Sequence, residues 1–213
     1  MKYIYEGVVV PTSVILPISI GLIIGYKRNY LKVIFFYLVF AGIIDVVEEI
    51  IGAYHVNNLP LLHFYTIIEF LFMMGFFQTI ITEILIRKLI RMLIFLFPLL
   101  AILNFIFFQS IYKYNSYPRP IAALIIIGLC ITYFFKRNEP DDQTSWTNDP
   151  LNWMVSGLLV YFGSSLFHFA FLNIVYEHAS LNLYFILGAI HATLVMIMYL
   201  LFAVGFLYAK NQR

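Results

Sequence analysis

Long apolar runs alternate with short polar stretches along this chain, and together they account for nearly all of its residues. Each run has close to the ~20 residues that an α-helix needs to cross the hydrocarbon core of a bilayer. Lipid offers the backbone no hydrogen-bond partners, so a spanning segment must pair its own N–H and C=O groups. The pattern therefore predicts an all-α, polytopic membrane protein, a seven-transmembrane-helix bundle with spans at 8–26, 31–52, 60–82, 88–108, 118–135, 150–174 and 182–208.

The composition supports the same class. Of the 213 residues, 62% are hydrophobic and 11% are charged, whereas soluble domains carry about 25% charged residues. Spans and short turns use nearly the whole chain, so we expect residues 1–213 to form a single integral membrane domain whose main partner is the lipid bilayer. The formal net charge of +2 is too small to indicate a nucleic-acid partner.

The basic residues predict how the chain crosses the membrane. With seven spans, most of the 13 Lys and Arg residues fall on one side, and Lys2, Lys113 and Arg119 fall on the other. Short cytoplasmic loops carry an excess of Lys and Arg, so we expect the N-terminus outside and the C-terminus in the cytoplasm. The expected location is the plasma (inner) membrane.

Acidic residues gather around the turn between the second and third spans. Asp45, Glu48 and Glu49 are three and four residues apart, so they share one side of a helix, and Tyr65 and Glu69 share one side of the next. A charge that faces lipid at this depth costs at least ~2.5–3.5 kcal/mol. We therefore expect these two sides to face the interior of the bundle.

Two histidines extend this polar cluster to the last two spans. Counted at about 1.5 Å per residue, His168 and His191 lie at a similar depth to Asp45 and Glu69, in the outer half of the membrane. Ser164 lies on the same helix side as His168, and Tyr184 lies on the same helix side as His191. The sequence predicts an acidic, histidine-containing pocket on the extracytoplasmic side, lined by Asp45, Glu48, Glu49, Tyr65, Glu69, Ser164, His168, Tyr184 and His191.

The residue types leave three interpretations of this cluster open. It is a hydrogen-bonded polar core that fixes helix packing, or a pocket for a small ligand, a cation or a proton. The second fits the acidic residues, because three carboxylates within two turns repel unless something neutralises them. The third is a divalent metal site, since histidine nitrogens with carboxylate oxygens suit zinc, manganese or iron. Its candidate ligands are Asp45, Glu69, His168 and His191.

Two seven-helix families can be compared on residues. Microbial rhodopsins hold retinal on a lysine of the last span, and 182–208 contains no lysine, so we expect no retinal. Ser164 and His168 resemble the Ser-x-x-x-His motif of the zinc hydrolases related to alkaline ceramidases and adiponectin receptors. That family has this motif in an early span and a His-x-x-x-His in the last, however, and His191 has no histidine four residues on. We therefore do not assign the chain to it.

Two similar segments indicate an internal repeat. IGLIIGYKRN at 20–29 and IGLCITYFFKRN at 127–138 both end in Lys-Arg-Asn at the same side of the membrane. Spans one to three would then correspond to spans five to seven, with the fourth as connector, and Glu69 would correspond to His191. A three-plus-one-plus-three parallel repeat occurs among small transporters.

The leading functional hypothesis is a seven-helix receptor-like or sensory membrane protein. A small extracytoplasmic ligand, cation or proton would bind in the pocket, and the cytoplasmic loops would pass the change to a signalling partner. The alternatives are a small solute transporter with a 3+1+3 helix repeat, an intramembrane metal-dependent hydrolase, and a purely structural polar core. The chain has no His-Glu-x-x-His, Gly-x-Ser-x-Gly or Gly-rich phosphate loop, which disfavours an enzyme.

Overall fold

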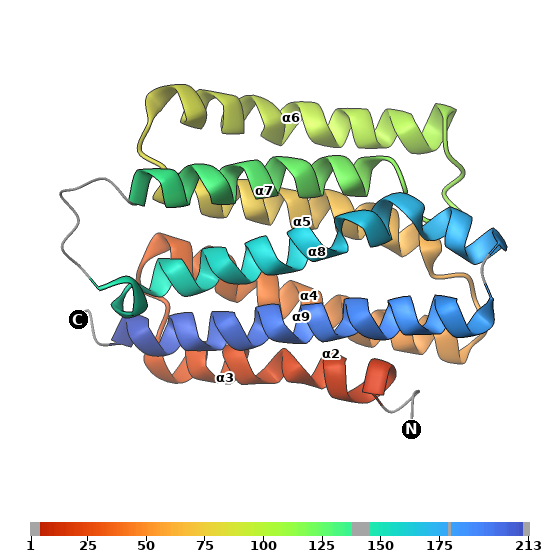
Figure 1. Cartoon of the computed structure of the whole chain (residues 1–213), viewed down its shortest axis with the longest axis horizontal. Coiled ribbons are helices and arrows are strands. Elements are labelled where there is room, and N and C mark those ends of the chain that lie inside the picture. The colour runs from red at the N-terminus through yellow and green to blue at the C-terminus, as the bar shows by residue number, and fades with distance from the viewer. Residues whose placement is uncertain (1–4, 138–144, 179, 211–213) are drawn as a thin grey trace.

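The apolar runs form long helices that lie side by side (Figure 1). The structure, a computed structural model, describes residues 5–137, 145–178 and 180–210. Its elements in chain order are the π-helix η1 (Tyr5–Val9), α2 (Val10–Ser13), α3 (Ile15–Ile24), α4 (Asn29–Ala53), α5 (Leu59–Ile80), α6 (Ile84–Phe107), α7 (Pro118–Arg137), the 3-10 helix η2 (Trp146–Asn148), α8 (Pro150–His178) and α9 (Leu181–Lys210).

Seven stretches of helix in the described residues are long and apolar enough to cross a membrane, as the sequence predicts. This finding indicates an integral membrane protein. The first stretch, Gly7–Ile24, is divided among η1, α2 and α3. Pro17 lies three residues after the break at Val14, and a proline inside a helix removes one backbone hydrogen bond.

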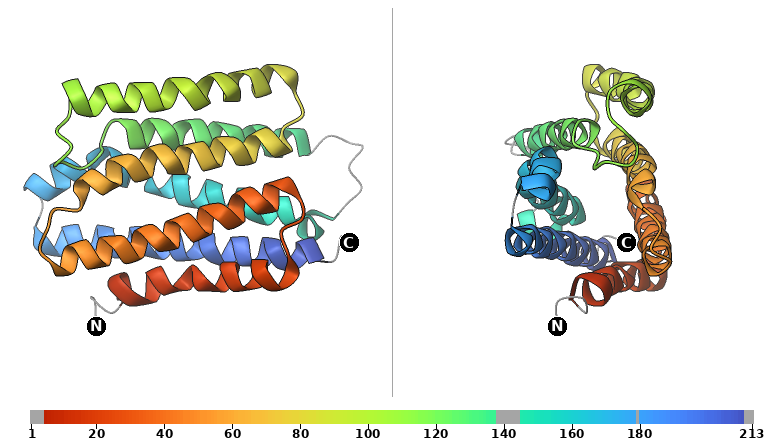
Figure 2. Two further views of the ribbon diagram at one scale, coloured as in Figure 1. Left: turned by 180° about the vertical axis from the view of Figure 1, so that it is seen from behind. Right: turned by 90° about the vertical axis from the view of Figure 1, so that its right-hand side faces the viewer.

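Six of the long helices form a closed ring, seen along the helix axes in Figure 2 (right). Around this ring α3 contacts α4, α4 contacts α5, α5 contacts α7, α7 contacts α8, α8 contacts α9, and α9 returns to α3. The remaining helix, α6, packs on the outside against α5 and α7. The ring thus sets α3 to α5 against α7 to α9, with the connector α6 outside.

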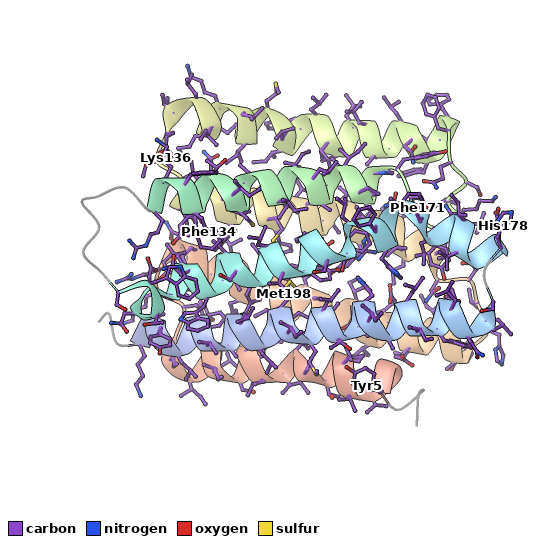
Figure 3. All side chains as sticks on the ribbon, viewed as in Figure 1. Tyr5, Phe134, Lys136, Phe171, His178 and Met198 are labelled. Atoms are coloured by element: carbon purple, nitrogen blue, oxygen red, sulfur yellow. The ribbon has the colours of Figure 1, made fainter. Side chains whose placement is uncertain are left out.

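The two ends of the bundle carry different segments. We call the end with η1 and segments 54–58 and 108–117 the N-terminal end, and the end with segments 25–28 and 81–83 the C-terminal end (Figure 1). Lys136 lies at the C-terminal end and His178 at the other (Figure 3). The charge pattern predicts that the C-terminal end is cytoplasmic. Two residues of that pattern, Lys2 and Arg213, lie outside the described residues.

The hydrophobic core fills only part of the ring. Its members are concentrated toward the C-terminal end, where large apolar side chains from four helices are fully buried, among them Leu38, Met74, Phe77, Leu158 and Phe202. Toward the other end the packing opens: no side chain of α4 after Ala41 is buried, and none of α9 before Met198. Met198 itself lies about midway along α9 (Figure 3). The ring therefore has a packed half and an open half.

Close helix contact holds the packed half together. At Gly205 of α9, an added Cβ would lie 2.8 Å from Met154 Cγ and 3.0 Å from the carbonyl oxygen of Pro150. Only a residue without a side chain fits this approach of α9 to α8. Between α5 and α6, the rings of Phe70 and Phe97 stack with centroids 3.9 Å apart.

Candidate functional site

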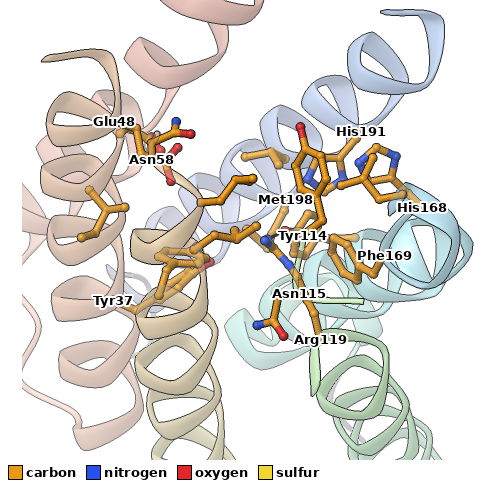
Figure 4. A pocket seen from close by; sticks show the side chains of 18 of the residues that line it. Tyr37, Glu48, Asn58, Tyr114, Asn115, Arg119, His168, Phe169, His191 and Met198 are labelled. Carbon is orange, nitrogen blue, oxygen red and sulfur yellow. Dashed lines mark hydrogen bonds between the residues drawn. The ribbon is translucent and has the colours of Figure 1, made fainter. Parts of the chain in front are cut away.

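A pocket of about 310 Å³ occupies the open half of the ring (Figure 4). Five helices line it, α4, α5, α7, α8 and α9, together with residues of segment 108–117. Its volume lies at the lower end of the range for small-molecule sites, about 300–1,000 Å³. The pocket begins where the core ends, because Met198 and Tyr199, the first buried residues of α9, line it.

Five of the nine residues predicted for the site line this pocket. They come from four helices, although they are up to 146 positions apart in the chain. Glu48 of α4 lies at one side, and the imidazole rings of His168 and His191 lie at another (Figure 4). The five are Asp45, Glu48, Tyr65, His168 and His191.

Glu69 lies behind the pocket wall and not in it. Its side chain is buried, with 2% exposure. The hydroxyls of Tyr37 and Tyr65 donate hydrogen bonds to Glu69 Oε1 at 3.1 Å and 3.0 Å. Both tyrosines line the pocket, so Glu69 anchors two wall residues from the outside.

The other three predicted residues do not line the pocket. Glu49 is exposed, and one of its carboxylate oxygens would lie 3.2 Å from a Cβ placed on Gly7. Ser164 is also exposed. Tyr184 is at the rim, where its hydroxyl is hydrogen-bonded to that of Tyr114 at 2.8 Å.

The two histidines form one stacked unit in the pocket wall. Their ring centroids are 4.6 Å apart and the ring planes differ by 9°. Ser165, next to the predicted Ser164, is fully buried, and its hydroxyl is hydrogen-bonded to His191 Nδ1 at 3.0 Å. A serine and a histidine in contact can serve as nucleophile and base. Here Ser165 does not line the pocket, so a substrate carbonyl in the pocket would not meet it.

The predicted metal-ligand set is not brought together. Among the described residues, no group of three or more His, Cys, Asp or Glu side chains could hold a metal ion. The reasons are local: two tyrosine hydroxyls occupy one oxygen of Glu69, and the Ser165 hydroxyl occupies His191 Nδ1. The metal hypothesis thus finds no support in residues 5–137, 145–178 and 180–210.

Arg119 is the main residue of the pocket that sequence reasoning missed. It begins α7 between two prolines, and its side chain reaches toward the middle of the pocket (Figure 4). Its Cζ lies 4.5 Å from the ring centroid of Phe169 and 5.6 Å from that of Tyr65. Nη2 donates a hydrogen bond of 3.4 Å to the Tyr161 hydroxyl, whereas the buried Nε has no hydrogen-bond partner.

The position of Arg119 contained little signal. It is the second residue of the predicted span 118–135, only a few Å from the end of the helix at about 1.5 Å per residue. The charge pattern therefore counted it with the few basic residues at that end of the bundle.

Segment 108–117 is fixed over one side of the pocket by amide side chains. The Asn173 side chain accepts a hydrogen bond from the Tyr114 backbone N–H at 3.1 Å and donates to the Tyr114 carbonyl at 2.9 Å and to Ser116 Oγ at 2.7 Å. Gln109 Nε2 donates to the same carbonyl at 2.7 Å. Tyr114 and Asn115 of this segment line the pocket, so α8 positions part of its wall.

The arrangement combines opposite charges and aromatic rings in one small space. Two carboxylates of α4, a guanidinium of α7, and aromatic rings of α5, α8 and α9 line the same pocket. Such a pocket can hold a small molecule with charged groups of both signs. In comparisons with known proteins, no family model, no curated protein and no solved structure matches this chain.

Proposed function

We propose that this chain is a seven-helix, receptor-like membrane protein that binds a small polar solute in the pocket. Binding would shift the helices of the ring, and a signalling partner at the C-terminal end would respond. The observation that carries the proposal is the pocket of about 310 Å³ beside a fully packed half of the same ring. A site that ends on a closed core fits sensing better than passage.

The packed half supports this choice. A solute that left the pocket toward the C-terminal end would have to displace fully buried side chains, including Met73, Met74, Phe77 and Phe202. Close-packed interiors leave few voids larger than a water molecule. Passage therefore requires the packed half to open along its whole length, whereas signalling requires only a shift of helices around a core that stays closed.

The proposed orientation places the pocket on the extracytoplasmic side. Basic residues at the C-terminal end, including Lys27, Arg28, Lys88 and Lys136, favour a cytoplasmic location for that end. The pocket then receives solutes from outside, and the short segments at the opposite end contact the cytoplasm.

A solute screen on the purified protein tests the proposal. Amino acids, sugars, organic acids and amines are each added at about 100 times the highest dissociation constant that the screen is meant to detect. A bound solute at that excess stabilises the folded state by about 2.7 kcal/mol. For a chain of this length this raises the unfolding midpoint by about 5–10 °C.

A pocket-filling variant identifies where a stabilising solute binds. Met198→Trp adds a large side chain at the base of the pocket, and Met92→Trp adds the same side chain on exposed α6. We expect Met198→Trp to abolish the stabilisation and Met92→Trp to keep it. The proposal is wrong if no solute stabilises the protein, or if every stabilising solute acts equally on both variants.

A transporter is the second candidate, because one observation favours it. The ring sets two groups of three helices against each other across the pocket, with α6 outside, which is the layout that a 3+1+3 repeat would give. Sealed vesicles containing the protein separate the two functions. With a receptor, the amount of solute held by the vesicles is proportional to the amount of protein. With a transporter, solute enters the vesicle interior, so the amount taken up exceeds the amount of protein.

A further inference from the structure

The charges in the pocket identify the class of molecule it fits. We infer that the ligand is a small zwitterion, with its anionic group at Arg119 and its ammonium group at Asp45 and Glu48. The inference rests on the proposed function, because it names the ligand of the same pocket. It goes beyond that function by specifying two charged groups and the residues that bind each.

Arg119 forms the anion-binding side. Its Cζ lies within cation–π distance of the rings of Phe169 and Tyr65, and the Tyr161 hydroxyl is its only hydrogen-bond partner among the described residues. The buried Nε has none. In the part of the chain that the structure describes, no carboxylate lies within ion-pair distance of Arg119, although Glu69 and Glu48 are near enough to attract its charge. A bound carboxylate or phosphate would add the direct, charge-assisted hydrogen bonds that the guanidinium lacks.

Asp45 and Glu48 form the cation-binding side. They are three residues apart on α4, both are half-buried, and both line the pocket. Neither makes a hydrogen bond or an ion pair with any described residue. The rings of Tyr161 and Tyr199 line the same space, and aromatic faces attract an ammonium group.

Only a ligand with both charges satisfies both sides. Glu48 and Arg119 enter the pocket from different walls, α4 and α7 (Figure 4). A simple cation would be repelled by Arg119, and a simple anion would be repelled by Asp45 and Glu48. A pocket of about 310 Å³ is large enough for a molecule of amino-acid size.

Buried polar atoms without partners support a ligand over a permanent internal ion pair. Besides Arg119 Nε, the side-chain oxygen of Asn115 is buried and has no hydrogen-bond partner, and Asn115 lines the pocket. Most buried polar atoms in proteins are hydrogen-bonded. These two atoms are shielded from the pocket as it stands, so a bound molecule would satisfy them only with a small movement of the Asn115 and Arg119 side chains.

The same charges occur on free amino acids and on the ethanolamine headgroup of lipids. The test therefore measures binding of the twenty protein amino acids, γ-aminobutyrate and glycerophosphoethanolamine to purified wild-type protein. Each amino acid that binds is compared with its α-amide, which keeps only the ammonium, and with its N-acetyl form, which keeps only the carboxylate. Preference for glycerophosphoethanolamine assigns the zwitterion to a lipid source, and preference for an amino acid assigns it to a free solute.

We expect at least one zwitterion to bind, and its singly charged derivatives to bind about 10-fold to 100-fold more weakly, since each lost charge-assisted contact has that effect. Arg119→Gln should weaken zwitterion binding by the same factor and leave binding of the amide unchanged or stronger. Arg119→Lys, which keeps the charge, should retain part of the affinity. Lys113→Gln is the control, because Lys113 is exposed at the same end and pairs with Glu177.

The inference is overturned if no zwitterion binds, or if an amide or an N-acetyl form binds as tightly as its parent. Its failure is distinguishable from failure of the proposed function. If a sugar or a simple amine stabilises wild type but not Met198→Trp, the pocket is a binding site and the zwitterion is wrong. If no solute of any class stabilises the protein, both are wrong.

Discussion

Individual side chains decide what this pocket can bind. Asp45, Glu48 and Arg119 bring charge into the open half of the ring, and the stacked pair of His168 and His191 forms another part of its wall. Glu69 contributes differently, because its carboxylate holds Tyr37 and Tyr65 in place from behind. In the proposed function, the charged and histidine side chains would recognise the solute, and Glu69 would maintain the shape of the wall.

Removing the tyrosine hydroxyls tests the role assigned to Glu69. Tyr37→Phe and Tyr65→Phe should each destabilise the protein by about 1–3 kcal/mol, because each removes a hydrogen-bond donor from a buried carboxyl oxygen. The double variant should cost more than either single one, since it leaves a buried carboxylate oxygen without these donors. Unfolding in detergent measures the effect.

Tyr208→Phe is the matched control, since the Tyr208 ring stacks on Trp153 with centroids 6.0 Å apart and its hydroxyl makes no hydrogen bond with a described residue. If both pocket variants are as stable as the control, the two hydrogen bonds to Glu69 contribute nothing and the assigned role is wrong.

At the scale of elements, segment 108–117 depends on α8. One side chain, Asn173, makes three hydrogen bonds to Tyr114 and Ser116, and these hold two residues of the segment against the pocket. The connection between α6 and α7 therefore forms part of the pocket wall, although α6 itself lies outside the ring.

Asn173→Leu should release this segment. Loss of three hydrogen bonds costs about 1.5–4 kcal/mol, and local stability governs amide exchange. We expect hydrogen exchange at 108–117 to rise by about tenfold or more and exchange in α9 to remain unchanged. Asn182→Leu, at an exposed position of the same end without a side-chain hydrogen bond to a described residue, is the control. Equal exchange in the two variants would contradict the role of Asn173.

The helices also show which parts of the structure could be predicted from the sequence. The number and type of helices were predictable, because apolar length is a strong constraint in membranes. The rotation of each helix about its own axis was less predictable from the sequence. A helix that is apolar all round, like α8, gives no periodic signal for its inner side. Ser164 and Ser165 are both close to His168 along the helix, and only the structure separates the exposed one from the buried one.

Arg119 was missed for a different reason. Basic residues near span ends are normally interpreted as orientation signals at the membrane surface. Its partners, Tyr65, Tyr161 and Phe169, belong to other helices, so no local pattern connects them with it. Tyr37 was missed likewise, because its contact with Glu69 depends on how α4 and α5 pack.

The whole molecule has two halves with different physical roles. The packed half fixes the ring through contacts such as that of α8 with Gly205 of α9, and the open half contains the pocket. Each group of three helices contributes one buried pairing between its second and third helices, Tyr37 with Glu69 in one and Ser165 with His191 in the other. The predicted repeat matches Glu69 with His191, but the same register matches Tyr37 with Leu159 and not with Ser165, so the two pairings correspond at one position only.

Cysteine labelling along α9 measures whether the pocket at the N-terminal end is open to water and stops at the packed half, and whether that end faces outward as proposed. His191, Val195, Phe202 and Phe206 follow one side of the helix, and the first two line the pocket while the last two are fully buried. Native Cys130 is buried and serves as an unreactive background. With a membrane-impermeant maleimide added to intact cells, we predict modification of His191→Cys and Val195→Cys but not of Phe202→Cys or Phe206→Cys. Equal reactivity at all four positions, or modification only after the cells are permeabilised, would contradict the account.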